Sequence, residues 1–201
     1  DPLTHVKNRG AYAQWEEKFN EEINNGEREA FAVVVCDINN LKTVNDLYGH
    51  KEGDTCIKNA CAKICKVFSH SPVFRIGGDE FVILLSGEDY NHRKELMKQI
   101  NALPGDRSKI KLGETVSVGI AEYDKSRHST LLSVFEEADK AMYERKQFMK
   151  KTFPLEETKT ETDPVPEYIP VIHARKTILI ADDIEMNREI LSDLLEDDYN
   201  I

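Results

Sequence analysis

The sequence predicts an α/β fold in which helices pack on a mixed central sheet. Residues 31–36 form a continuous apolar run rich in β-branched side chains, which is typical of a strand buried on both faces. Two further apolar segments, 72–74 and 81–85, enclose Gly77-Gly78-Asp79-Glu80 and predict a hairpin, since glycine can adopt positive φ in a tight turn. Helical periodicity alternates with these strands, and that alternation with one hairpin indicates a mixed sheet.

The helices are predicted by apolar residues spaced three or four positions apart. The first runs through Tyr12, Trp15 and Ile23 and ends at Asn24-Asn25-Gly26. After the first strand, we expect a helix that opens near Asp54 and runs to Phe68, followed by the hairpin. A weaker, charged helix is expected at 89–101, stopped before Pro104-Gly105. The remaining expected elements are a short edge strand around Ile110 and Leu112, a strand at 116–120 and a helix at 131–142.

The chain has 201 residues, enough for one full core and a little more. It contains no apolar run long enough to cross a membrane and no signal-peptide pattern, and it begins inside a motif. We therefore expect a cytoplasmic piece of a larger protein. The cysteines lack metal-type spacing with histidines, which predicts buried free thiols rather than a zinc site; they are Cys36, Cys56, Cys61 and Cys65.

The net charge of −10 is unevenly distributed. Residues 152–201 hold 13 acidic and 4 basic side chains, whereas residues 1–151 are nearly neutral, with 24 acidic and 23 basic. A nucleic-acid surface normally shows a clustered basic patch, which this sequence lacks, so we expect no nucleic-acid partner. A polyanionic substrate would have to be held by metal and a few lysines.

Three carboxylates are candidates for a metal site. Asp79 and Glu80 are adjacent in the predicted hairpin turn, and Asp37 follows the apolar strand at 31–36. If the strand neighbours the hairpin, the three converge, and hard oxygen ligands suit Mg²⁺ or Mn²⁺. Each feature alone has a simpler interpretation: Asp37 caps the next helix, and Asp79-Glu80 is a solvated turn. Taken together with the motifs below, the residues favour the metal site.

Several motifs in order resemble the GGDEF domain, the diguanylate cyclase family, over residues 1–151. The residues that carry the resemblance are Asp1-Pro2-Leu3-Thr4, Asn8-Arg9, Asp37-Ile38-Asn39-Asn40-Leu41-Lys42, Asn45-Asp46, Gly49-His50, Gly53-Asp54, the signature turn Gly77-Gly78-Asp79-Glu80-Phe81, and Ala138-Asp139-Lys140-Ala141-Met142-Tyr143 with Lys146. The resemblance implies a fold similar to the palm of nucleotidyl cyclases and polymerases.

The resemblance also implies a reaction and its cofactors. Two GTP molecules would be joined into cyclic di-GMP with release of two pyrophosphates, using two Mg²⁺ or Mn²⁺ ions per active site. Asp37, the backbone carbonyl of Ile38, Asp79 and Glu80 would hold the metal. Asp79 is also the candidate for assisting proton removal from the attacking 3′-hydroxyl, a role that the sequence does not separate from metal ligation.

Substrate-binding residues follow from the same resemblance. Asn45 and Asp54 would contact guanine, whose N1–H and N2–H donors suit a carboxylate acceptor. The local sequence alone instead favours a structural role for both residues, as helix caps or turn residues. Lys42, Lys146 and Lys150 match positions near the triphosphate. His50 lies in the matched loop, where a structural hydrogen bond is expected, and Arg75 is expected to order the turn that contains Gly77 and Gly78.

One departure from the family concerns feedback. Many members carry an Arg-x-x-Asp product-inhibition site shortly before the signature turn, and here those positions are Phe68-Ser69-His70-Ser71. We therefore expect no tight product feedback at this site.

The C-terminal part has a different character. Residues 152–176 are rich in Pro, Thr and Glu and predict an extended linker. Residues 177–181 predict a strand that ends in Asp182-Asp183, followed by a helix through Leu194, which resembles the truncated start of a response-regulator receiver domain. A generic α/β start is the alternative.

Two functions remain open at this point. The first is an active diguanylate cyclase, in which two GGDEF domains face each other as a homodimer because each binds one GTP. The second is a non-catalytic GTP-binding regulatory module. Such modules usually lose a signature carboxylate, and the presence of Asp37, Asp79 and Glu80 favours catalysis.

Overall fold

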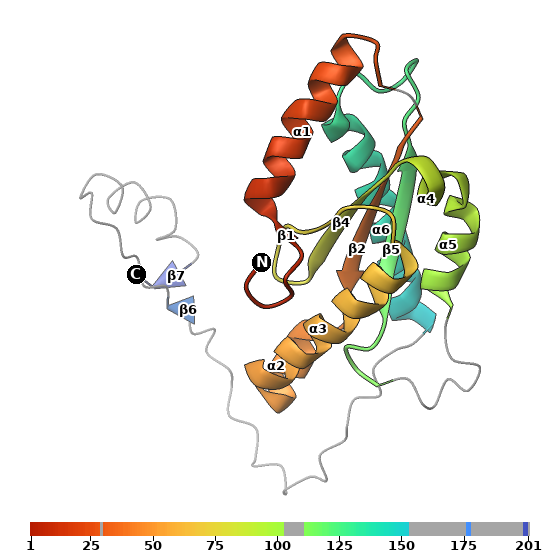
Figure 1. The fold of residues 1–201 in the computed structure, drawn as a ribbon. Coiled ribbons are helices and arrows are strands. Elements are labelled where there is room, and N and C mark those ends of the chain that lie inside the picture. Colours follow the sequence, from red (N-terminus) through yellow and green to blue (C-terminus); the bar gives the residue numbers. More distant parts are fainter. Residues whose placement is uncertain (29, 103–110, 153–175, 178–198, 201) are drawn as a thin grey trace, which may run out of the picture. The chain divides into compact units, whose positions relative to one another are not determined.

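Five strands form the central sheet of the computed structural model, which describes residues 1–28, 30–102, 111–152, 176–177 and 199–200 (Figure 1). The strand order is β1-β3-β4-β2-β5. The strands are β1 (Lys7–Asn8), β2 (Ala32–Ile38), β3 (Val73–Arg75), β4 (Glu80–Leu85) and β5 (Val116–Glu122). Because β1 pairs parallel with β3 and the other pairs of this sheet are antiparallel, the predicted mixed sheet is confirmed.

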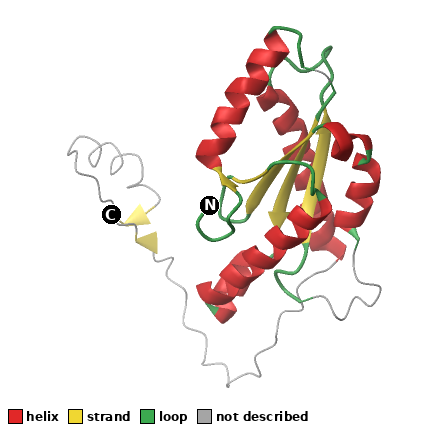
Figure 2. Ribbon diagram, in the orientation of Figure 1, coloured by secondary structure: helices red, strands yellow, loops and turns green. Residues whose placement is uncertain are grey.

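Helices cover both faces of the sheet (Figure 2). They are α1 (Arg9–Asn24), α2 (Leu41–Tyr48), α3 (His50–Val67), α4 (Gly87–Asn91), α5 (Arg93–Asn101) and α6 (Leu131–Thr152). Apolar residues of α2, α3 and α5 pack on one face, and those of α1 and α6 pack on the other. The result is a three-layer α/β/α arrangement.

Strand β2 contributes to both layers, as its apolar run predicts. All seven of its residues are buried. Val34 and Cys36 belong to the core beneath α2 and α3, whereas Val33 and Val35 belong to the core beneath α1 and α6. Because side chains alternate along a strand, Asp37 points to the α1/α6 face.

The predicted start of the second helix is wrong. The helix α3 begins at His50, and its N-cap residue is Gly49, which has a φ of 84°. The short helix α2, which the sequence analysis does not predict, ends directly before this glycine. A glycine with positive φ allows the sharp corner between the two helices. Asp54 therefore lies inside α3, which excludes the N-cap interpretation, and Asn45 lies inside α2.

Two further elements differ from expectation. The single charged helix predicted at 89–101 is a pair, α4 and α5, interrupted at His92. Leu112 lies in a turn rather than in an edge strand, and Ile110 lies outside the described residues. The strand β1 is also missed, because two residues are too few for a period-of-two pattern.

The chain divides into two compact units, Asp1–Glu156 and Glu157–Ile201. In the second, only β6 (Lys176–Thr177) and β7 (Tyr199–Asn200) are described, and they pair in parallel. The helix through Leu194 and residues 153–175 of the expected linker lie outside the described residues. The two end residues of that linker are described, and they belong to α6 (Thr152) and β6 (Lys176). Within the described ranges, none of the helices combines the length and apolar character that a membrane crossing requires.

Candidate active site

The register of two antiparallel strands brings Asp37 and Glu80 together. Asp37 in β2 is directly opposite Glu80 in β4. Residues paired in this way project from the same face of the sheet, with Cβ atoms roughly 5 Å apart. The backbone N–H of Ile38 also donates to the carbonyl of Asp79 at 3.2 Å. The end of the first long strand and the hairpin turn are thus adjacent, although Asp37 lies inside the strand rather than beyond its end.

The signature turn is not the tight, positive-φ turn that its glycines allow. Neither Gly77 nor Gly78 has positive φ. The loop closes with a hydrogen bond of 3.1 Å from the Ile76 N–H to the Glu80 carbonyl. Gly77 has a different role, because a Cβ at this position would lie 2.7 Å from Glu80 Oε2. The absence of a side chain at Gly77 therefore leaves room for the Glu80 carboxylate.

Arg75 connects the signature turn to the N-terminus. Its Nε and Nη2 donate to the Gly78 carbonyl at 3.2 and 2.8 Å, and its Nη1 donates to Asp1 Oδ1 at 3.0 Å. The same Asp1 oxygen accepts from the Thr4 N–H at 3.0 Å and from Thr4 Oγ1 at 2.8 Å. We call Asp1–Thr4 the N-terminal turn. The planar fork of arginine is suited to bridging two acceptors in this way.

Helix α6 delivers a lysine to the carboxylates. Lys146 Nζ lies 2.7 Å from both oxygens of Asp37, and Oδ2 accepts its hydrogen bond. Asp37 Oδ1 is buried and takes part in the ion pair with Lys146, although the geometry does not make it a hydrogen-bond acceptor. The helix can approach this closely because β5 has a glycine, Gly119, where a Cβ would overlap the backbone of Ala138 and Met142. The family resemblance predicts Lys146 near the triphosphate, whereas its contact with Asp37 is evident only from the structure.

The site concentrates negative charge. Asp37 is only 4% exposed. Burial raises its pKa, opposed by the hydrogen bond from Lys146, and Asp79 raises it further. Burial also raises the pKa of Glu80, with added repulsion from Asp79, Asp37 and Asp139. Asp139, on α6, is a contributor that the sequence analysis does not single out, although it belongs to the quoted Ala138–Tyr143 motif.

A divalent cation would relieve this repulsion, because it favours the ionised form of each carboxylate. Among the described residues, however, no group of three or more His, Cys, Asp or Glu side chains is arranged to hold a metal ion. What fits a cation is a buried carboxylate, Asp37, which already pairs with the ammonium group of Lys146 and faces a second acid across the strand pair.

The other predicted substrate residues lie on two neighbouring helices. In α2, the Asn45 side chain lies directly against Gly53 of α3, where a Cβ would overlap its Oδ1. The next residue, Asp54, is exposed. Lys42 in α2 and His50, the first residue of α3, are exposed as well. Lys150 is an exposed residue one turn beyond Lys146, and it is close enough to lower the pKa of Asp37 slightly.

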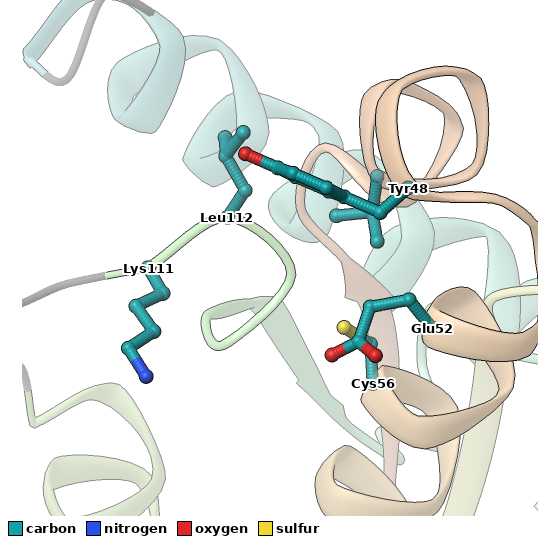
Figure 3. Close-up of a pocket in the computed structure, with 6 residues that line it drawn as sticks. Tyr48, Glu52, Cys56, Lys111 and Leu112 are labelled. Carbon is teal, nitrogen blue, oxygen red and sulfur yellow. The ribbon is translucent and has the colours of Figure 1, made fainter.

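A cavity of about 400 Å³ lies beside α2 and α3, apart from the carboxylates. Tyr48 and Leu112 border one side of it, and Glu52 and Cys56 border the other (Figure 3). Two of its lining residues, Val44 and Cys56, belong to the core beneath α2 and α3, on the opposite sheet face from Asp37. The candidate active site is therefore the carboxylate cluster and not this cavity.

Known proteins match the chain over its N-terminal three quarters. The family model "Diguanylate cyclase, GGDEF domain" matches residues 1–152. The diguanylate cyclase DgcS of Shewanella oneidensis is 32% identical over 149 residues, which are 73% of this chain and 49% of DgcS. The cyclic di-GMP phosphodiesterase PdeR of Escherichia coli is 31% identical, over 73% of this chain and 22% of PdeR. The chain thus spans half or less of the length of these relatives.

The fold also matches a solved structure. The GGDEF domain of DgcB from Caulobacter crescentus, in complex with c-di-GMP, superposes with a TM-score of 0.56 at 27% identity. The match covers 74% of this chain and 90% of that domain. Since the family model spans residues 1–152 and includes every carboxylate of the site described above, the chain belongs to the GGDEF-domain family of diguanylate cyclases.

Proposed function

We propose that residues 1–152 condense GTP into cyclic di-GMP, two GTP molecules yielding one product and two pyrophosphates. The observation that carries the proposal is the placement of the buried carboxylate of Asp37, already paired with Lys146, opposite Glu80. Relatives named as diguanylate cyclases support the same activity. The whole protein's activity is part of this proposal, because the chain spans only part of those relatives.

The proposed metal ligands are Asp37, the carbonyl of Ile38, Asp79 and Glu80. These are hard oxygen donors, which suit Mg²⁺ or Mn²⁺. The proposed stoichiometry is two ions per site. When bound, such ions neutralise charge on the phosphates and lower the pKa of an attacking hydroxyl.

The protein's own groups position the reactants. In the proposed reaction the 3′-oxygen of one GTP forms a bond to the α-phosphorus of the other, and the bond to pyrophosphate breaks. Asp79 accepts the proton of the 3′-hydroxyl. Lys42, Lys146 and Lys150 hold the triphosphate, and Lys146 exchanges Asp37 Oδ2, which it contacts at 2.7 Å, for a phosphate oxygen. Such transfers depend on positioning and charge more than on covalent catalysis.

Guanine recognition is assigned to Asn45 and Asp54. Helices α2 and α3 are in contact where the Asn45 side chain lies against Gly53, the residue that precedes Asp54. The exposed Asp54 carboxylate can accept from guanine N1–H and N2–H, a donor pair that adenine lacks. Losing such an acceptor leaves polar groups of the base unpaired, so Asp54→Ala should weaken GTP binding.

Product analysis tests the function directly. The purified protein is incubated with GTP and Mg²⁺ or Mn²⁺, and cyclic di-GMP is measured by chromatography and mass spectrometry. We expect product from the wild-type protein and none from Asp79→Ala. Glu88→Ala, which removes an exposed acid in α4, beyond the opposite end of β4 from the signature turn, is the control and should retain activity. Folded wild-type protein that forms no product at high concentration would overturn the proposal.

A second candidate function is a regulatory module that binds GTP without converting it. It is favoured by one finding, the match to a relative named as a cyclic di-GMP phosphodiesterase. Calorimetry with GTP distinguishes the two functions. GTP binding without product formation identifies the regulatory module, whereas binding with product formation identifies the cyclase.

The remaining assignments concern regulation and context. We propose a cytoplasmic enzyme without tight product feedback, because residues 68–71 lack the Arg-x-x-Asp pattern. In the structure these positions serve another purpose, since the His70 N–H and Ser71 Oγ donate to the buried Asp89 at 3.1 and 2.7 Å. Binding of cyclic di-GMP that is lost in His70→Ala would contradict the absence of feedback.

We further propose a linker at 152–176 and a receiver-like start at 177–201. The proposal rests on the sequence pattern, since residues 152–176 contain four prolines and the apolar run at 177–181 ends in Asp182-Asp183. Limited proteolysis should cut within 152–176 and leave a stable fragment of residues 1–151. Cleavage inside residues 1–151 before any cut in the linker would contradict this arrangement.

A further inference from the structure

We propose that Cys61 and Cys65 form a site of reversible oxidation, which a peroxide or a small disulfide compound converts to an intrahelical disulfide. The oxidation would loosen the N-terminal turn and, through it, the signature turn. The covalent part of this proposal is independent of the proposed cyclase activity. Only the predicted effect on product formation depends on that activity.

The two sulfur atoms are close enough for this chemistry. Both cysteines lie on α3, one turn apart, and their Sγ atoms are 4.0 Å from each other. Residues four apart on an α-helix have Cα atoms about 6 Å apart, inside the range of about 4.4–6.8 Å found for disulfides. Closing the bond brings the sulfurs to about 2 Å and strains the helical turn. Strained disulfides are the readily reduced, regulatory ones.

The two thiols differ in their surroundings. Cys61 is 4% exposed, whereas Cys65 is partly exposed at the edge of the same core. Burial and the neighbouring Cys65 raise the pKa of Cys61 to about 11, so Cys61 remains a thiol at neutral pH. Cys65 is therefore the sulfur that an oxidant reaches first.

The oxidation can be written in balanced steps. With a peroxide, the Cys65 thiolate attacks one peroxide oxygen and forms an S–O bond. The O–O bond breaks, hydroxide or alkoxide leaves and takes up a proton from water, and Cys65 becomes a sulfenic acid. The Cys61 sulfur then attacks Cys65 sulfur, the S–O bond breaks, and water leaves with the Cys61 proton. With a disulfide compound, Cys65 forms a mixed disulfide and Cys61 displaces the second thiol. In both routes the cysteine pair loses two protons and two electrons, which pass to the peroxide or to the disulfide compound.

The oxidised pair would disturb the N-terminal turn by contact. Cys61 Sγ lies 4.0 Å from the Thr4 carbonyl oxygen, within reach of a weak S–H hydrogen bond. Leu3 packs against the core cluster that contains Cys61. A disulfide consumes the S–H donor and draws the sulfur toward Cys65. Both changes remove the contact between Cys61 and the Thr4 carbonyl.

Thr4 is connected to the signature turn by charged hydrogen bonds. Thr4 donates to Asp1 Oδ1, the acceptor that also binds Arg75 Nη1, and Arg75 holds the Gly78 carbonyl. Arg75 and Asp1 are largely buried, with side chains 13% and 17% exposed. A movement of Thr4 is therefore transmitted to the Gly78 carbonyl through Asp1 and Arg75. The cysteines need not contact the substrate.

Mass spectrometry tests the covalent step. Trypsin cuts after Lys58, Lys63 and Lys66, which places Cys61 in residues 59–63 and Cys65 in residues 64–66. After treatment with hydrogen peroxide or oxidised glutathione, the intact protein should lose two hydrogen atoms in mass. The two peptides should then be linked in the digest and separate on reduction. Cys65→Ala should abolish the linked peptide, whereas Cys56→Ala, at a buried cysteine of the same helix, should not.

Hydrogen–deuterium exchange tests the transmission. Oxidation should increase exchange at residues 1–6 and 75–79 in the wild type and leave it unchanged in Cys65→Ala. Product formation should fall about tenfold on oxidation and recover on reduction, as expected for a displaced catalytic loop. Absence of the linked peptides would overturn the proposal. A disulfide that forms without raising exchange at 75–79 would equally overturn the proposed connection to the signature turn.

Discussion

Gly77 and Gly78 are neighbours in sequence, yet a methyl group at each would meet different surroundings. At Gly77 the Cβ would lie 2.7 Å from Glu80 Oε2, whereas at Gly78 nothing lies within 4 Å. Neither position has positive φ, so alanine fits both backbones. We expect Gly77→Ala to displace the Glu80 carboxylate and to lower product formation about tenfold or more. Gly78→Ala is the matched control.

The measurements for this pair are the initial rate of cyclic di-GMP formation and the melting temperature. Because the atom displaced at Gly77 is the end of a flexible side chain, both variants should unfold within about 1 kcal/mol of the wild type. Equal rates in the two variants would show that Glu80 tolerates the displacement.

The raised pKa values of Asp37 and Glu80 predict how pH and metal affect the stability of the fold. Burial and neighbouring carboxylates raise the pKa of both acids, so the folded state holds these protons to higher pH than the unfolded chain does. Without metal, their contribution favours folding below about pH 4 and is lost as pH rises through their folded pKa values. Mg²⁺ binds the ionised carboxylates and should offset that loss.

We therefore expect Mg²⁺ to raise the melting temperature more at about pH 7 than at about pH 4.5. Asp37→Asn should remove most of the difference, since the amide carries no charge. Thermal unfolding with and without Mg²⁺ at both pH values measures this. A Mg²⁺ effect of the same size in Asp37→Asn would assign the ion to another site.

At the scale of elements, the contact between α6 and β5 positions the lysine of the site. Gly119 in β5 faces the backbone of Ala138, Ala141 and Met142, and α6 carries Lys146 to Asp37. A side chain at Gly119 cannot be accommodated by rotating a flexible neighbour, because the atoms it meets are backbone. Gly119→Ala should therefore push the helix outward and reduce the free energy of unfolding by about 3 kcal/mol.

Gly10 provides the comparison for this substitution. It is an exposed residue in the first turn of α1, and its nearest neighbour for a Cβ is Asn8 Oδ1 at 3.5 Å, an ordinary contact. Gly10→Ala should leave stability unchanged or raise it by up to about 1 kcal/mol, through helix propensity. Chemical denaturation of the two variants checks both expectations. Similar destabilisation in both would mean that the α6–β5 contact is not the cause.

The elements were predictable where their patterns are long. Helices α1, α3 and α6 have apolar residues at helical spacing, and β2 and β4 are continuous apolar runs. The two-residue β1 was not predictable, because it is too short to show a period. Helix α2 could have been found, since Leu41, Val44 and Tyr48 follow the i, i+3, i+7 spacing of a helix. The start of α3 was misplaced because Asp54 is a good capping residue by type, while the actual boundary depends on the backbone conformation of Gly49.

At the scale of the whole molecule, the proposed reaction requires two active sites that face each other. Each domain supplies one set of carboxylates, and cyclic di-GMP contains two guanosine units. We expect the rate per domain to rise with protein concentration and to level off as the dimer forms. Product assays over a range of concentrations, with light scattering of the same samples, measure this. A rate per domain that is independent of concentration, in a protein that stays monomeric, would contradict the paired mechanism.

The family and the candidate residues were determined by the sequence alone. Apolar runs and helical periodicity are local properties, and the motifs from Asp1 to Lys146 occur in order along the chain, so both can be recognised without coordinates. The same is true of the choice of Asp37, Asp79 and Glu80, because carboxylates at the ends of apolar segments suggest a metal site by residue type.

The geometry that connects these residues was decided only by the tertiary structure. The pairing of Asp37 with Glu80 depends on strand register, and the contact of Lys146 with Asp37 joins residues 109 positions apart. The space that Gly77 leaves for Glu80 and the contact of Cys61 with Thr4 likewise depend on how distant segments pack. Sequence patterns report the environment of single residues, whereas such contacts depend on the free energy of the whole packed arrangement.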